Sequence, residues 1–205
     1  TLPENGEYNS GKIIIGDSRC FEMGIFEHVY DLNEYAVFAV WGGHFVEGRG
    51  FNILAEENLQ DIEQCIISQI ENKGECIIYL FASVNDYDYT NEKNQINYDS
   101  FVESANKLKN FKVQSDGKNY SPEIRIIGFD GCIETGDLYG TPAEDFNKYI
   151  SEYNDTLKEM LNISGYTDYT TVMDIVGGKA GFTLDGLHYD EITIGKIIDY
   201  ICERE

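Results

Sequence analysis

Apolar residues along the chain fall into two alternating patterns. Short runs rich in β-branched and aromatic residues predict buried strands at residues 13–15, 36–40, 76–81, 124–129 and 170–175. Between and after these runs, apolar residues recur at helical spacing and predict helices that begin near residues 19, 58, 100, 141 and 191. The chain therefore alternates strands with helices from end to end.

Two of the helix starts have explicit capping signals. Ser100 and Glu103 have the spacing of a capping box. Thr141-Pro142-Ala143-Glu144 offers an N-cap, a proline at the first helical position and an acidic third position. We expect helices to begin at both places.

This alternation predicts an α/β fold, a three-layer α/β/α sandwich around a five-stranded parallel, flavodoxin-like sheet. Parallel strands need crossover connections, so their carboxyl ends meet at one edge of the sheet, where ligands bind. Three long irregular stretches follow strands and are expected at that edge: residues 41–57, 83–97 and 176–190. Residues 12–205 are expected to form one domain after a linker or flexible segment at residues 1–11.

Composition narrows the classes of partner. The 205 residues include 15 Lys and Arg against 37 Asp and Glu, a formal charge of −22 that repels nucleic acid and anionic membrane surfaces. No apolar run approaches the ~20 residues that cross a bilayer. The polar, linker-like start favours an extracellular or cell-envelope location, with the cytoplasm as the alternative.

The first strand leads directly into a candidate nucleophile. Gly16-Asp17-Ser18 follows residues 13–15 and would place a serine at the carboxyl end of a core strand. A simple helix cap accounts for the same tripeptide. Cys20 lies two residues further on, where a packed thiol is the expected alternative to a second nucleophile.

A serine needs a base, and the chain has three histidines. His28 falls in the first predicted helix and His44 follows the second strand, whereas His188 follows the fifth strand in Asp185-Gly186-Leu187-His188. The glycine would let Asp185 fold back onto the imidazole, so that acid and base reach the site from one loop. Capping of the following helix is an equally good explanation of this pair.

Candidate oxyanion donors follow two other strands. Asn85 comes after the third strand and has an amide that can donate a hydrogen bond. Gly48-Arg49-Gly50 follows the second strand and would expose a backbone N–H. Each motif alone is common in turns and loops, but their occurrence in this order after successive strands is not.

With these motifs the chain resembles the SGNH subset of the GDSL hydrolases from about Lys12 to the end. The resemblance implies that Ser18 is the nucleophile, with Asp185 and His188 as acid and base. It further implies an oxyanion hole made by Ser18, Asn85 and a glycine, for which Gly50 is favoured over Gly48. Ser83 stands where the family has a glycine in the block that contains Asn85.

The expected activity is hydrolysis of small-molecule or carbohydrate esters through an acyl-enzyme, with no cofactor and no metal. A carbohydrate O-acyltransferase of the same fold is one alternative. A non-catalytic flavodoxin-like binding module is another, although the carboxylate of Asp17 would repel a phosphate at the end of the first strand.

Overall fold

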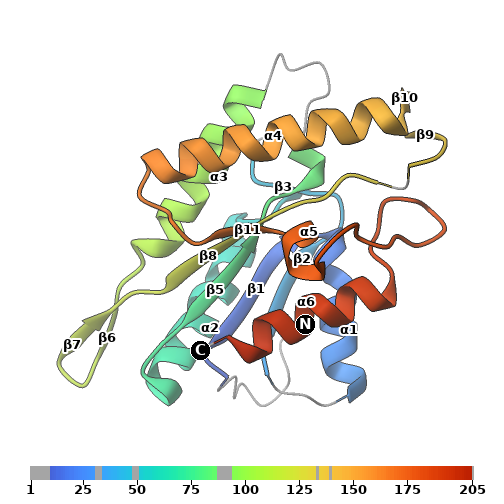
Figure 1. The fold of residues 1–205 in the computed structure, drawn as a ribbon. Coiled ribbons are helices and arrows are strands. Elements are labelled where there is room, and N and C mark those ends of the chain that lie inside the picture. The colour runs from blue at the N-terminus through green and yellow to red at the C-terminus, as the bar shows by residue number, and fades with distance from the viewer. Residues whose placement is uncertain are drawn as a thin grey trace.

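A five-stranded parallel sheet forms the centre of the computed structural model (Figure 1). The structure describes residues 10–30, 34–47, 51–86, 94–132, 134–138 and 140–204. In spatial order the strands are β11 (Tyr169–Thr171), β8 (Glu123–Gly128), β5 (Ile77–Phe81), β1 (Lys12–Asp17) and β2 (Ala36–Val40). This is the flavodoxin-like order, and it confirms the predicted α/β/α architecture.

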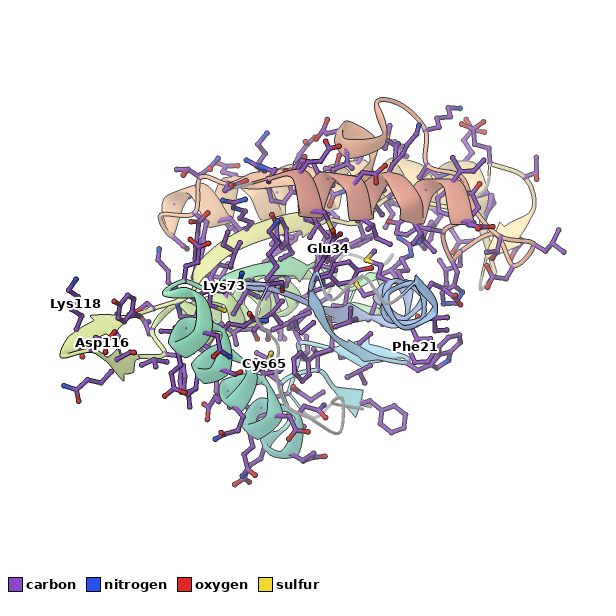
Figure 2. The ribbon with its side chains drawn as sticks, turned by 90° about the horizontal axis from the view of Figure 1, so that it is seen from below. Phe21, Glu34, Cys65, Lys73, Asp116 and Lys118 are labelled. Atoms are coloured by element: carbon purple, nitrogen blue, oxygen red, sulfur yellow. The ribbon has the colours of Figure 1, made fainter. Side chains whose placement is uncertain are left out.

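Alternating side chains of β1 divide the core into two layers. Ile13 and Ile15 belong to a cluster with α2 (Glu56–Lys73), α3 (Asn94–Lys109) and α4 (Ala143–Ile163). Ile14 points to the other face and packs with α1 (Phe21–Tyr30) and α6 (Glu191–Glu203). Figure 2 shows α2 and α6 on opposite sides of the sheet. No helix among the described residues is long and apolar enough to cross a membrane.

Several short elements lie outside the pattern read from the sequence. They are the 3₁₀ turns η1 (Ser18–Cys20) and η2 (Val84–Asp86), the short α5 (Val172–Val176) and the pairs β3 (Gly43–His44) with β4 (Phe51–Asn52), β6 (Val113–Ser115) with β7 (Lys118–Tyr120), and β9 (Asp137–Leu138) with β10 (Thr141–Pro142). Asp116 and Gly117 join β6 to β7 with φ angles of 49° and 73°. Figure 2 labels Asp116 and Lys118 on this hairpin.

Three sequence-based boundaries were wrong. The strand predicted at 170–175 ends at Thr171, and the residues after it form α5. The helix begins there because Thr171 and Asp174 form a reciprocal capping box. The box expected at Ser100 lies inside α3, which begins at Asn94. Pro142, not Thr141, is the N-cap of α4, because Thr141 pairs with Leu138.

Gly16 at the end of β1 is required by packing. A Cβ added there would lie 2.4 Å from Cys20 Sγ and 3.0 Å from Phe81 Cβ, both in fully packed surroundings. The absence of a side chain lets the turn into η1 fold tightly against β5. The glycine that precedes Asp17 and Ser18 therefore has a steric role of its own.

Gly16→Ala should lower the free energy of unfolding by about 1–3 kcal/mol, because the added methyl group overpacks the junction of β1 and η1. Urea denaturation measures the change. Gly195→Ala is the matched control, since a Cβ at this α6 position meets nothing within 4 Å. The control should gain about 0.5–1 kcal/mol from higher helix propensity. Equal stability of the two variants would contradict the steric argument.

Candidate active site

The candidate side chains meet at the carboxyl-terminal edge of the sheet. Ser18 begins η1 directly after β1, and Asn85 lies in η2 after β5. His188 lies in the loop between α5 and α6. Crossover connections place these three segments together although they are far apart in the sequence.

Ser18, His188 and Asp185 form a continuous hydrogen-bonded chain. His188 Nε2 lies 2.9 Å from Ser18 Oγ, and His188 Nδ1 lies 2.6 Å from Asp185 Oδ2. An ionised carboxylate accepts hydrogen bonds only, so Nδ1 carries the proton that is donated to Asp185. Nε2 is then the basic nitrogen, and it faces the serine hydroxyl.

The loop around Gly186 presents Asp185 to the imidazole. Gly186 has a φ of 73°, which lets the chain fold back as the sequence suggested. Asp185 Oδ1 accepts hydrogen bonds from the backbone N–H groups of Leu187 and His188 and from Thr183 Oγ1. Desolvation opposes ionisation, but these bonds together with the imidazole lower the pKa of Asp185 below its ordinary range. The carboxylate is therefore ionised at neutral pH.

A second carboxylate, Asp17, holds the ends of β1 and β5 together. Its side chain is 1% exposed. Oδ1 accepts the N–H of Arg19 at 3.0 Å, and Oδ2 accepts the N–H of Val84 at 2.9 Å. Burial raises the pKa of Asp17, although Arg19 and these hydrogen bonds oppose the rise. Asp17 thus connects the turn at Ser18 to the start of η2, and the sequence did not predict it as a site residue.

Ser83 and Asn85 complete the connection to Gly43 at the start of β3. Ser83 Oγ lies 3.1 Å from Asp17 Oδ2 and 2.7 Å from Gly43 O, and accepts the N–H of Asn85 at 3.1 Å. Asn85 Nδ2 lies 3.2 Å from Gly43 O and 3.4 Å from Asp17 Oδ2. The serine that departs from the family motif thus adds a hydrogen-bonding group that a glycine lacks.

The oxyanion glycine stays a prediction. Gly48 and Gly50 lie outside the described residues, so their position relative to Ser18 is not part of the structure. Neighbouring β3 is anchored by Asp86, whose carboxylate accepts the N–H of Phe45 at 2.7 Å and lies 3.1 Å from His44 Nδ1. His44 is thereby engaged with Asp86, and the side chain of His28 is outside the described part of the chain.

Cys20 and Arg19, which follow Ser18, have structural roles. Cys20 is fully buried, and burial raises the pKa of its thiol well above the ordinary value, so a thiolate nucleophile is disfavoured. Arg19 is also buried and donates to the carbonyl oxygens of Asp130 and Gly131, each at 2.7 Å. Its guanidinium contacts the ring of Tyr189, next to His188, at 4.9 Å. Arg19 therefore connects the segment after β8 to the His188 loop.

Among the described residues, a cavity and the absence of a metal cluster characterise the surroundings of the candidate site. Within the described ranges, no group of three His, Cys, Asp or Glu side chains could hold a metal ion. A cavity of about 900 Å³ lies between α4, β11 and the segments after β8 and before α6; Ser18 and His188 do not line it. Asp130 lines it, and burial raises the pKa of this carboxyl to about 6.

The chain is similar to known proteins in fold but not in sequence. No family model and no curated protein matches the sequence. A solved aryl esterase from M. smegmatis superposes with a TM-score of 0.65 at 8% identity, covering 94% of this chain and 96% of the other. A carbohydrate acetylesterase from Sinorhizobium meliloti superposes with a TM-score of 0.63 at 11% identity, over 94% and 96% of the two chains. At such low identity, the comparison shows that the chain shares the fold of these esterases and shows nothing further.

Proposed function

We propose that this chain is a serine ester hydrolase. The observation that carries the proposal is the hydrogen-bonded chain from Asp185 through His188 to Ser18. In this chain, His188 Nε2 faces Ser18 Oγ at 2.9 Å. This arrangement can activate a serine for acyl transfer. The fold shared with esterases supports ester hydrolysis over other chemistry.

In the proposed reaction, Ser18 Oγ attacks the ester carbonyl carbon while His188 Nε2 takes the hydroxyl proton. Asp185 stabilises the imidazolium that forms. When the tetrahedral intermediate collapses, His188 returns the proton to the leaving alcohol, and an acyl-serine remains. Water then attacks this ester while His188 takes a proton from the water. His188 returns the proton to Ser18 Oγ, and the carboxylic acid is released.

The developing oxyanion needs donors close to Ser18. We assign this role to the amide of Asn85, to the backbone N–H of Ser18 and to Gly50, with Gly48 as its alternative. Asn85 Nδ2 has two protons, and its bond to Gly43 O uses one of them. The second proton is directed to Asp17 Oδ2 at 3.4 Å, a long contact that Asn85 would exchange for a bond to the oxyanion.

The charge of the chain favours a neutral substrate. With a formal charge of −22, the protein repels anionic esters over long range. Two proteins of similar structure are an aryl esterase and a carbohydrate acetylesterase. We therefore propose acetyl and other short acyl esters, of a sugar or an aryl alcohol, as the substrate class.

Ser18→Ala should lower the hydrolysis of p-nitrophenyl acetate by at least about 1,000-fold, because the nucleophile is lost. Release of p-nitrophenol measures the rate. A fluorophosphonate probe should label wild type at Ser18 and leave the variant unlabelled. Ser68→Ala in α2 is the matched control. Equal rates in Ser18→Ala and wild type would refute the proposed function.

Asp185→Asn should lower kcat by about 10³- to 10⁴-fold, because an amide nitrogen facing Nδ1 disfavours the tautomer in which Nε2 is basic. The amide oxygen can still accept the N–H groups of Leu187 and His188, so the loop should keep its shape. Steady-state kinetics together with the melting temperature test this. A variant that retains near wild-type kcat would exclude Asp185 as the orienting acid.

Asp17→Asn should lower both kcat and stability. An amide nitrogen at Oδ2 would face the donors Val84 N–H and Asn85 Nδ2, leaving buried donors unpaired at a cost of about 1–3 kcal/mol. Displacement of Ser18 and Asn85 should lower kcat by about 100-fold. Ser83→Ala, which removes one of the groups around Asp17, should have smaller effects in kinetics and urea denaturation. The reverse order would contradict the role given to Asp17.

A further inference from the structure

Trp41 covers one face of the His188 imidazole. The two rings are stacked, with centroids 5.0 Å apart and an interplanar angle of 21°. Phe21, the first residue of α1, contacts Trp41 edge to face with centroids 6.3 Å apart and an angle of 89°. The indole is thus supported from two sides although the residue is 64% exposed.

The pairing of β1 with β2 explains this placement. The parallel register aligns Asp17 with Val40, so the next residues, Ser18 and Trp41, leave neighbouring strands at the same level. Gly42 follows with a φ of 63° and turns the chain toward β3. The sheet therefore fixes Trp41 beside the serine, while His188 arrives from a distant loop.

Single exposed hydrophobic side chains are common and need no functional explanation. Trp41 differs because its contact is with the proposed general base. The His188 side chain is only 17% exposed whereas that of Asp185 is 51% exposed, so the imidazole is mostly covered, in part by the indole, while its carboxylate partner is open to solvent. An indole face also attracts a cation within about 6 Å of its centre, and an imidazolium forms whenever Ser18 gives up its proton.

We propose that Trp41 is a positioning residue for His188, holding the imidazole toward Ser18 and stabilising the imidazolium by a cation–π interaction. The proposal rests on the proposed function, since the imidazolium matters to turnover only if His188 is the base. It differs from that function in naming a residue that acts through His188 without contacting the ester.

Few charged groups in the described part of the molecule lie near the His188 imidazole, so a change with pH can be assigned to this residue. Asp185 on the same loop is the charged group that contacts the ring within the described chain, and the hydroxyl of Ser18 faces it from η1. Arg19 of η1 directs its guanidinium to the carbonyl oxygens of Asp130 and Gly131 instead. Trp41 and Phe21 contribute uncharged rings.

The chain contains one tryptophan, so its fluorescence reports on Trp41 alone. A protonated imidazole in contact with an indole quenches its emission. Wild-type fluorescence should therefore fall in a single step as the pH is lowered. The step should disappear in His188→Gln and persist in His44→Gln. A step that persists in His188→Gln overturns the proposal, and this readout needs neither substrate nor activity.

Kinetics with p-nitrophenyl acetate provide the second readout. Trp41→Leu should lower kcat by about 2- to 10-fold with little change in KM, and should move the acid limb of the kcat/KM profile about 0.5 pH unit lower. Trp41→Phe should restore most of both losses, because it keeps an aromatic face. Ile163→Ala, an exposed residue at the end of α4, is the control.

These outcomes separate the inference from the proposed function. A raised KM with unchanged kcat in Trp41→Leu would make Trp41 a substrate contact and overturn the positioning role. A lower melting temperature with an unchanged pH profile would make it merely structural, which also overturns the proposal. Full activity of Ser18→Ala would instead refute the proposed function, while the fluorescence step would still test the contact between Trp41 and His188.

Discussion

The buried carboxylate of Asp17 is the interaction on which the candidate site depends. It accepts donors from η1 on one side and from the start of η2 on the other, so one side chain fixes the exits of β1 and β5. Placing a charge there is unfavourable unless every lone pair is used, and Arg19, Ser83, Val84 and Asn85 all lie within hydrogen-bonding distance. The turn that presents Ser18 is therefore held by electrostatics as well as by the steric fit of Gly16.

Two aspartates of the site lie in opposite environments, and their proposed roles differ accordingly. Burial raises the pKa of Asp17, which serves as an internal connector. Hydrogen bonds outweigh desolvation at the half-exposed Asp185 and lower its pKa, which keeps a negative charge beside the imidazole. A base that must gain a proton in the transition state needs a partner that stays ionised, and Asp185 satisfies this condition while Asp17 does not contact the ring.

The sequence was sufficient where the signal is local or repeated. Alternating apolar runs predicted the parallel sheet, and the motifs at Ser18 and His188 pointed to two segments that lie within hydrogen-bonding distance. The prediction failed where a capping contact overrides propensity, as at Thr171, and the hairpin at Asp116-Gly117 lies outside the predicted pattern. Contacts such as Asp17 with Ser83 join residues distant in sequence, and no spacing rule in a single chain predicts them.

Trp41 illustrates how sheet register can create a site that no motif contains. Neither Trp41 nor its neighbours resemble a catalytic signature, yet Trp41 follows the strand that pairs with β1, and its indole stacks on His188. The proposed base lies on a loop in which Asp185 is half-exposed, and the aromatic residue that follows β2 covers one face of the imidazole. In the proposed role, a side chain fixed by the central sheet orients a base that lies on a loop, and this role would explain why the tryptophan is exposed.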